Sequence, residues 1–254
     1  MFRFIIILVS FLVSSSSPDE MQMGIDYFNA RATNAKGLVA DETNINKAIT
    51  VFEKQISENK STEQAVAYYL KSLNFKGRFV AMNDETKKKI YRKAKDLGNK
   101  YIRQYPESGP IRFELISSIG LEAEMDGILK SIQNDVMKLM LYHSQMLIKT
   151  DSMCMQGGGW KVLAILNYKT PNIPLLVSWP SKETAKKLLQ KSLVYFPTII
   201  SNNFYYAEAL LENKENVRAK IYFQLVLKLP PRKDCVLEDE YFKIKARKYL
   251  EKMV

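Results

Sequence analysis

The chain has 254 residues, a formal net charge of +11 and 46% hydrophobic residues. This length fits one or two domains, and the apolar fraction excludes an intrinsically disordered chain. Two cysteines and one histidine are too few for a disulfide-rich scaffold or a common zinc site, and no nucleophile with a matching base stands out. We therefore expect no catalytic residues, no metal and no cofactor, and hence no enzyme.

The first residues have the pattern of a secretory signal peptide. Arg3 precedes a ten-residue apolar run over 4–13, and serines follow at 14–17. As a helix this run would rise about 15 Å, roughly half of a bilayer core. We expect a signal peptide over 1–16 and an exported, soluble domain over 17–254, periplasmic or secreted. The alternative is an uncleaved anchor, and membrane contact is otherwise expected to be peripheral at most.

Apolar residues at helical spacing predict an all-α protein. The expected helices, in chain order, cover about 21–35, 45–56, 61–80, 84–105, 110–125, 132–147, 162–168, 181–196, 202–211, 216–229 and 238–254. Pro106 ends the fourth of them, and Pro110 opens the fifth. No stretch alternates with period two for long enough to indicate a sheet.

A small residue, a large apolar residue and a proline recur after 34 residues. The two sets are Ala185, Leu189 and Pro197, then Ala219, Phe223 and Pro231. This period is typical of antiparallel helix hairpins stacked into a superhelix. Ala94 also precedes a proline, Pro106, by twelve residues, as the other two alanines do.

The strongest resemblance is to the tetratricopeptide repeat, and it is clearest over 181–231. Ala207, Ala219, Phe223 and Pro231 are similar to its small, small, aromatic and proline positions, although Asn203 stands where its tryptophan would be. The resemblance implies a binding or scaffold module whose first helices line a concave face. The implied partner is a protein or peptide, with a homo-oligomer possible.

A second resemblance, over about 110–231, is to the T-component of TRAP transporters. It depends on the order of the glycine run 157–159, an apolar helix, two prolines and the repeat. That family implies a periplasmic, ligand-handling accessory of a transport system, which would bind a small anionic solute and form oligomers. Nucleic acid is not an expected partner of an exported chain, despite the basic charge.

The candidate ligand or partner groove combines the glycine loop with the first helix of the last predicted hairpin. Its residues are Gly157, Gly158, Gly159, Trp160, Lys161, Phe204, Tyr205, Glu208 and Leu211. The loop could offer backbone amides to an anion, and the aromatics with the carboxylate could hold a peptide or a cation. For the glycine loop, the alternative is a tight turn between closely packed helices. For the aromatic residues, the alternative is burial against the neighbouring hairpin.

Several charged or sulfur-bearing groups carry two interpretations each. The basic runs at 87–95 and 182–191 either contact an acidic partner or lipid head groups, or are solvated helix faces. The acidic group of Glu122, Glu124 and Asp126 is expected to be a solvated helix end, and the alternative is an acid pair. His143 is expected to be a hydrogen-bonded core residue, and whether Cys154 and Cys235 pair is left open.

Overall fold

The computed structural model describes residues 18–58, 62–127, 130–131, 135–171 and 180–253. The predicted signal peptide lies outside these residues. In the part of the chain that the structure describes, the named elements are eleven helices: α1 Pro18–Asn29, α2 Glu42–Ser57, α3 Glu63–Phe79, α4 Asp84–Gln104, α5 Gly109–Asp126, α7 Val136–Asp151, α8 Cys154–Lys169, α9 Lys182–Tyr195, α10 Ile200–Glu212, α11 Asn216–Lys228 and α12 Val236–Glu251.

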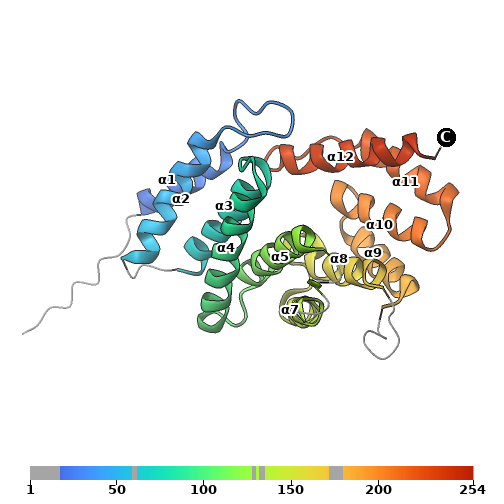
Figure 1. Cartoon of the computed structure of the whole chain (residues 1–254), viewed down its shortest axis with the longest axis horizontal. Coiled ribbons are helices and arrows are strands. Elements are labelled where there is room, and N and C mark those ends of the chain that lie inside the picture. The colour runs from blue at the N-terminus through green and yellow to red at the C-terminus, as the bar shows by residue number, and fades with distance from the viewer. Residues whose placement is uncertain (1–17, 59–61, 128–129, 132–134, 172–179, 254) are drawn as a thin grey trace, which may run out of the picture.

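The helices form sequential hairpins, α1/α2, α3/α4, α5/α7, α8/α9 and α10/α11, and α12 follows as an unpaired first helix. The first helices also contact one another in series, from α1 through α3, α5, α8 and α10 to α12. We call this series the inner row (Figure 1). The predicted all-α architecture of stacked antiparallel hairpins is therefore confirmed.

Local sequence signals explain five of the helix starts. Asp41, Thr62, Asn83 and Ser108 each accept a hydrogen bond from a first-turn amide, and so does Ser181 before α9. Such caps satisfy backbone donors that have no partner inside the helix. The helix α5 has its proline in the first turn and ends at Gly127, whose φ is +86°, as expected for glycine.

The 34-residue pattern marks the contacts between helices. Ala185, Ala219 and Phe223 are fully buried, as is Ala207 on the facing helix α10. Small side chains let the two backbones of a hairpin approach, and the large apolar residue fills the space beside them. Twelve residues, 170–181, separate α8 from α9, so the 34-residue period does not extend back through this hairpin.

The structure corrects the prediction that the glycine run 157–159 forms a loop. Met155, Gln156 and Gly157 have left-handed backbone angles, and the regular part of α8 begins at Gly158 rather than near 162. A Cβ on Gly158 would lie 2.5 Å from the Phe113 ring, and one on Gly159 would lie 2.8 Å from Ile148. Only glycine allows this close approach, so the run serves the tight packing of α8 against α5 and α7.

The chain closes on itself through α12. Leu237, in its first turn, is buried in the core of the N-terminal hairpins, together with Phe28 and Phe75. Farther along the same helix, Phe242 and Ala246 belong to the C-terminal core built around α10. As Figure 1 shows, α12 runs from the N-terminal hairpins toward the C-terminal end of the array. The helix therefore joins the two ends of the inner row.

Candidate binding face and its polar cluster

Polar side chains from four helices of the inner row act on one another. They are Arg78 on α3, Glu124 on α5, Tyr205 on α10 and Tyr241 on α12, and we call them the inner cluster. The Arg78 guanidinium lies 5.1 Å from the centre of the Tyr241 ring. Burial is the main cause of the raised pKa of both tyrosines, and Arg78 and Glu124 act on each of them electrostatically. All four side chains retain accessible surface.

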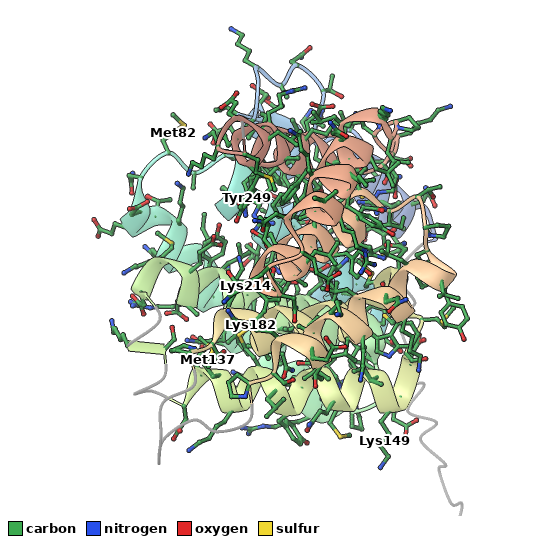
Figure 2. All side chains as sticks on the ribbon, turned by 90° about the vertical axis from the view of Figure 1, so that its right-hand side faces the viewer. Met82, Met137, Lys149, Lys182, Lys214 and Tyr249 are labelled. Atoms are coloured by element: carbon green, nitrogen blue, oxygen red, sulfur yellow. The ribbon has the colours of Figure 1, made fainter. Side chains whose placement is uncertain are left out.

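Glu208 lies next to this cluster but is fully engaged. It is buried, and its carboxylate accepts hydrogen bonds from the hydroxyls of Tyr168, at 2.6 Å, and Tyr249, at 2.8 Å. The Lys169 ammonium lies 3.7 Å from the same carboxylate. Tyr249 lies among the C-terminal helices in Figure 2. Glu208 therefore joins three helices of the inner row, α8, α10 and α12, rather than facing an open groove.

The structure also corrects the prediction that Phe204 lines the groove. Its side chain is 0% exposed, with the rings of Phe223 and Phe242 at 5.7 and 5.2 Å. The helix α10 is covered by neighbours on most sides, so helical spacing alone did not distinguish its core face from its inner face. Leu211 is partly buried against the same core. Of the four predicted residues on α10, Tyr205 is the one that belongs to the inner cluster.

Trp160 and Lys161 have different environments. Trp160 is buried, stacks on Tyr195 and has the Lys191 ammonium 4.8 Å from its ring centre, so it has a packing role. Lys161 is half-buried and donates to Ser201 Oγ at 3.1 Å and Asn202 Oδ1 at 3.2 Å. Burial, followed by the charge of Arg232, lowers the pKa of Lys161 to about 8.

The first basic run and the acidic group near Gly127 are partners. Lys88 pairs with Asp126 at 2.7 Å and Arg92 with Glu122 at 2.8 Å, and Lys95 also contacts Glu122. The acidic residues are thus not merely a solvated helix end, because they tie α5 to α4. The basic side chains remain partly exposed, whereas the Glu122 side chain is largely buried.

The second basic run is also largely used within the array. Lys182 pairs with Glu212 at 2.7 Å, and Lys186 pairs with Glu215 at 2.9 Å. These pairs connect α9 to the following hairpin. Both basic runs are thus partly used in contacts between helices, whereas Lys87 and Lys187 pair with carboxylates of their own helices.

His143 is buried on α7, and its Nδ1 lies 3.1 Å from Arg112 Nη1. Because the guanidinium can only donate, Nδ1 accepts and the imidazole is neutral. Burial, together with the charge of Arg112, lowers the pKa of His143 to about 4. The geometry agrees with the expected hydrogen-bonded core residue.

This arrangement predicts a loss of stability in acid. The unfolded histidine binds its proton near pH 6.5, whereas the folded one does so only near 4, so the free energy of unfolding should fall as pH drops through this window. The loss should be on the order of 3 kcal/mol. Urea denaturation at several pH values should show a shallower decline for His143→Gln, since this is the chain's one histidine. Equal declines in both proteins would contradict this assignment.

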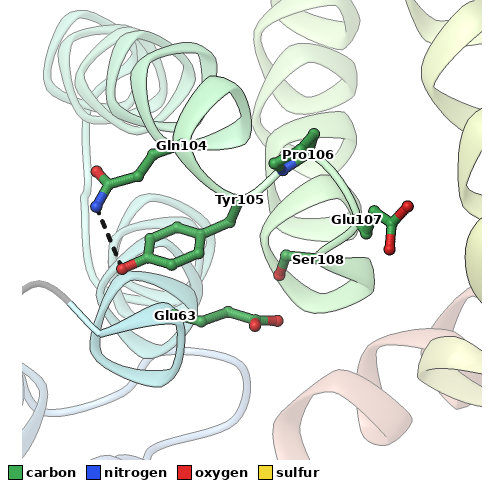
Figure 3. A pocket seen from close by; sticks show the side chains of 6 residues that line it. All are labelled: Glu63, Gln104, Tyr105, Pro106, Glu107 and Ser108. Atoms are coloured by element: carbon green, nitrogen blue, oxygen red, sulfur yellow. Dashed lines mark hydrogen bonds between the residues drawn. The ribbon is translucent and has the colours of Figure 1, made fainter.

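Two surface depressions among the described residues lie away from the predicted groove. One of about 420 Å³ is lined by Glu63, by Gln104 and Tyr105 at the end of α4, and by the α4–α5 turn at 106–108 (Figure 3). Another, of about 310 Å³, lies along α4 beside Lys88, Lys89 and Arg92. Neither contains a residue of the predicted groove.

Two further observations concern the described residues. Cys154 and Cys235 are both free thiols, and no group of three potential metal ligands is found among the residues that the structure covers. Within the same ranges, no helix combines the length and the apolar character needed to span a bilayer.

Comparison with known proteins supports the fold. No family model matches the chain, and no curated protein matches it. A solved structure does: TTC0263, a thermophilic TPR protein of Thermus thermophilus, with a TM-score of 0.57 and 12% sequence identity over 92% of this chain and 97% of that one. The fold is TPR-like. In this TPR-like array the sequence had placed Tyr205 correctly on a first helix, but it had not identified Arg78 or Tyr241 as its neighbours.

The helix of Tyr241 could have been recognised as a first helix from the repeat. A helix was predicted over about 238–254, and one more 34-residue period beyond the helix at 202–211 places a first helix near 236–245, although Tyr241 is offset by two residues from the position that Tyr205 would give. Arg78 carries no such signal, because only the closure of the array brings the end of α3 near α12.

Proposed function

We propose that this TPR-like chain is an exported module that binds a polypeptide partner on its inner row. The observation that carries the proposal is the inner cluster: the Arg78 guanidinium lies 5.1 Å from the Tyr241 ring centre, and Arg78 and Glu124 both act electrostatically on the partly accessible Tyr205 and Tyr241. Tyrosine offers a large contact area with a polar tip, and charges of both signs select a register. First helices of repeat arrays commonly present such surfaces to their partners.

Position-specific cross-linking tests this proposal. A photoreactive phenylalanine analogue at Tyr241, expressed in the native host, should form adducts with a discrete polypeptide. The same analogue at Val217, which is 78% exposed on the outer helix α11, is the matched control. We expect adducts from position 241 only, with a lower yield after Glu124→Lys. Adducts from both positions, or from Val217 alone, would contradict binding at the inner row.

Export is part of the same proposal and has its own measurement. The intact mass of the protein recovered from its native host should correspond to a chain that lacks about the first 16 residues. A full-length mass would instead support the uncleaved anchor.

The alternative function, handling of a small anionic solute, is favoured by one observation. Lys161 makes its two hydrogen bonds to neutral oxygens, and Arg232 adds positive charge nearby. A solute carboxylate would find a cation there. Native mass spectrometry distinguishes the two functions, because a retained small molecule that is lost in Lys161→Met would support the solute.

A further inference from the structure

An ion pair with a buried arginine and a glutamate that is 25% exposed connects the beginning of the array to its last helix. Arg31 Nη2, just after α1, lies 2.8 Å from Glu238 Oε1 in the first turn of α12, and it also donates to the carbonyl oxygen of Asp234. The Arg31 side chain is 2% exposed. We call this the closing contact, because the paired residues are 207 positions apart in the chain.

The N-terminal hairpins form an apolar socket with two cations around this contact. The Arg31 guanidinium lies 4.2 Å from the Phe28 ring centre and 5.1 Å from that of Phe75. The Lys71 ammonium lies 4.9 Å from the Phe28 ring centre. Leu237 fills the apolar part of the socket and is 4% exposed. The socket residues come from α1, α3 and the segment after α1, and none comes from α12.

The residues that fill the socket match it in charge. From 234 to 240 the chain reads Asp-Cys-Val-Leu-Glu-Asp-Glu, with four acids and no base, in a protein that is strongly basic overall. Glu238 supplies the carboxylate to Arg31, and Leu237 precedes it. In the structure, the socket therefore binds a leucine that is followed by a residue with a carboxylate side chain.

The closing contact is not fully satisfied. Arg31 Nε and Glu238 Oε2 are both buried without a hydrogen-bond partner. A buried donor or acceptor left unpaired costs about 1–3 kcal/mol. A partner segment that also accepted a hydrogen bond from Arg31 Nε would avoid this cost on the socket side, and Glu238 would return to solvent when it is displaced.

We propose that the socket of Phe28, Arg31, Lys71 and Phe75 is a second recognition site for an acidic partner segment carrying an aliphatic residue followed by a carboxylate. In the closed chain Leu237 and Glu238 occupy it, so they act as a built-in competitor. The inference rests on the proposed function, in that the natural ligand is a polypeptide. A tethered competitor has an effective concentration in the millimolar range, so it suppresses binding until the partner is abundant or α12 is displaced.

A synthetic peptide tests the socket. The probe is a fluorescent peptide of residues 230–242, with serine in place of its cysteine, added to the full chain. We expect Glu238→Ala, which removes the tethered carboxylate, to bind it at least ten-fold more tightly than the wild-type chain. A peptide with asparagine and glutamine in place of its leucine and first glutamate should bind neither. Equal affinity of both chains for the probe, or equal affinity of both peptides, would overturn the proposal.

The reactivity of the Cys235 thiol gives a second measurement that does not depend on the Glu238→Ala variant. Cys235 lies next to the closing contact and is partly buried, so displacement of the segment should expose it. In a Cys154→Ser background, the rate of Cys235 alkylation should rise several-fold with probe concentration, and the altered peptide should have no effect. A rate that is unchanged up to millimolar probe would overturn the proposal even if Glu238→Ala failed to fold.

The two proposals fail separately. Adducts from position 241 without any probe binding would contradict only the proposal for the socket. Probe binding without adducts would contradict only the proposal that the inner cluster is the partner site.

Discussion

Replacing Phe223 with alanine is expected to lower the free energy of unfolding by roughly 3–5 kcal/mol. Phe223 is fully buried on α11, its ring stacks on Tyr249 with centroids 4.7 Å apart, and Phe204 lies 5.7 Å away. These neighbours belong to α10 and α12, so the cavity would open where three helices meet. Because the helices hold these rings in place, the cavity cannot collapse easily.

Thermal and urea denaturation provide the measurement, with Val217→Ala as the control on the same helix. Val217 is 78% exposed, so its truncation should change stability by no more than about 0.5 kcal/mol. Equal effects of the two substitutions would mean that α11 is packed in another register.

Asp239→Ala is expected to destabilise the protein by about 3–5 kcal/mol, because it removes one partner of a buried ion pair. Asp239 is 0% exposed. Its carboxylate accepts from Arg232 Nη2 at 2.7 Å, and from the Arg232 Nε and backbone amide at 2.9 Å each. Without it, the guanidinium would remain half-buried without a countercharge.

Chemical denaturation of two variants separates charge from shape. Asp239→Asn keeps the volume and one acceptor but removes the charge, so it should fall between the wild type and Asp239→Ala. The double variant Arg232→Met with Asp239→Leu removes both charges and should recover much of the loss. A double variant no more stable than Asp239→Ala would show that packing, rather than charge, dominates here.

The repeat part of the fold was predictable because its signals are local. Alanine, a large apolar residue and proline at fixed offsets specify a hairpin, and capping residues such as Asn83 and Ser108 specify where helices begin. The start of α8 was mispredicted because glycines usually indicate a loop. Here they allow three helices to pack closely, which was the alternative interpretation of the glycine run, and the neighbours Phe113 and Ile148 identify the other two helices as α5 and α7.

The binding face was predictable only in part. Tyr205 follows from the register of α10, but Phe204, its neighbour in sequence, is core because α12 covers it. The inner cluster and the closing contact depend on how the array curves. This curvature arises from small rotations between successive hairpins, and these rotations cannot be predicted from a single sequence. Arg31 and Glu238, far apart in sequence, accordingly gave no sign of their pairing.

The closing contact also has a consequence for how the protein is made. An open solenoid can gain and lose its terminal repeats one at a time, since each unit depends only on those beside it. Here the N-terminal hairpins present Arg31 and an apolar surface that α12 covers, so a nascent chain exposes both until α12 has been synthesised. Fraying from either terminus should in turn be coupled to the other, which makes unfolding more cooperative than in a linear stack.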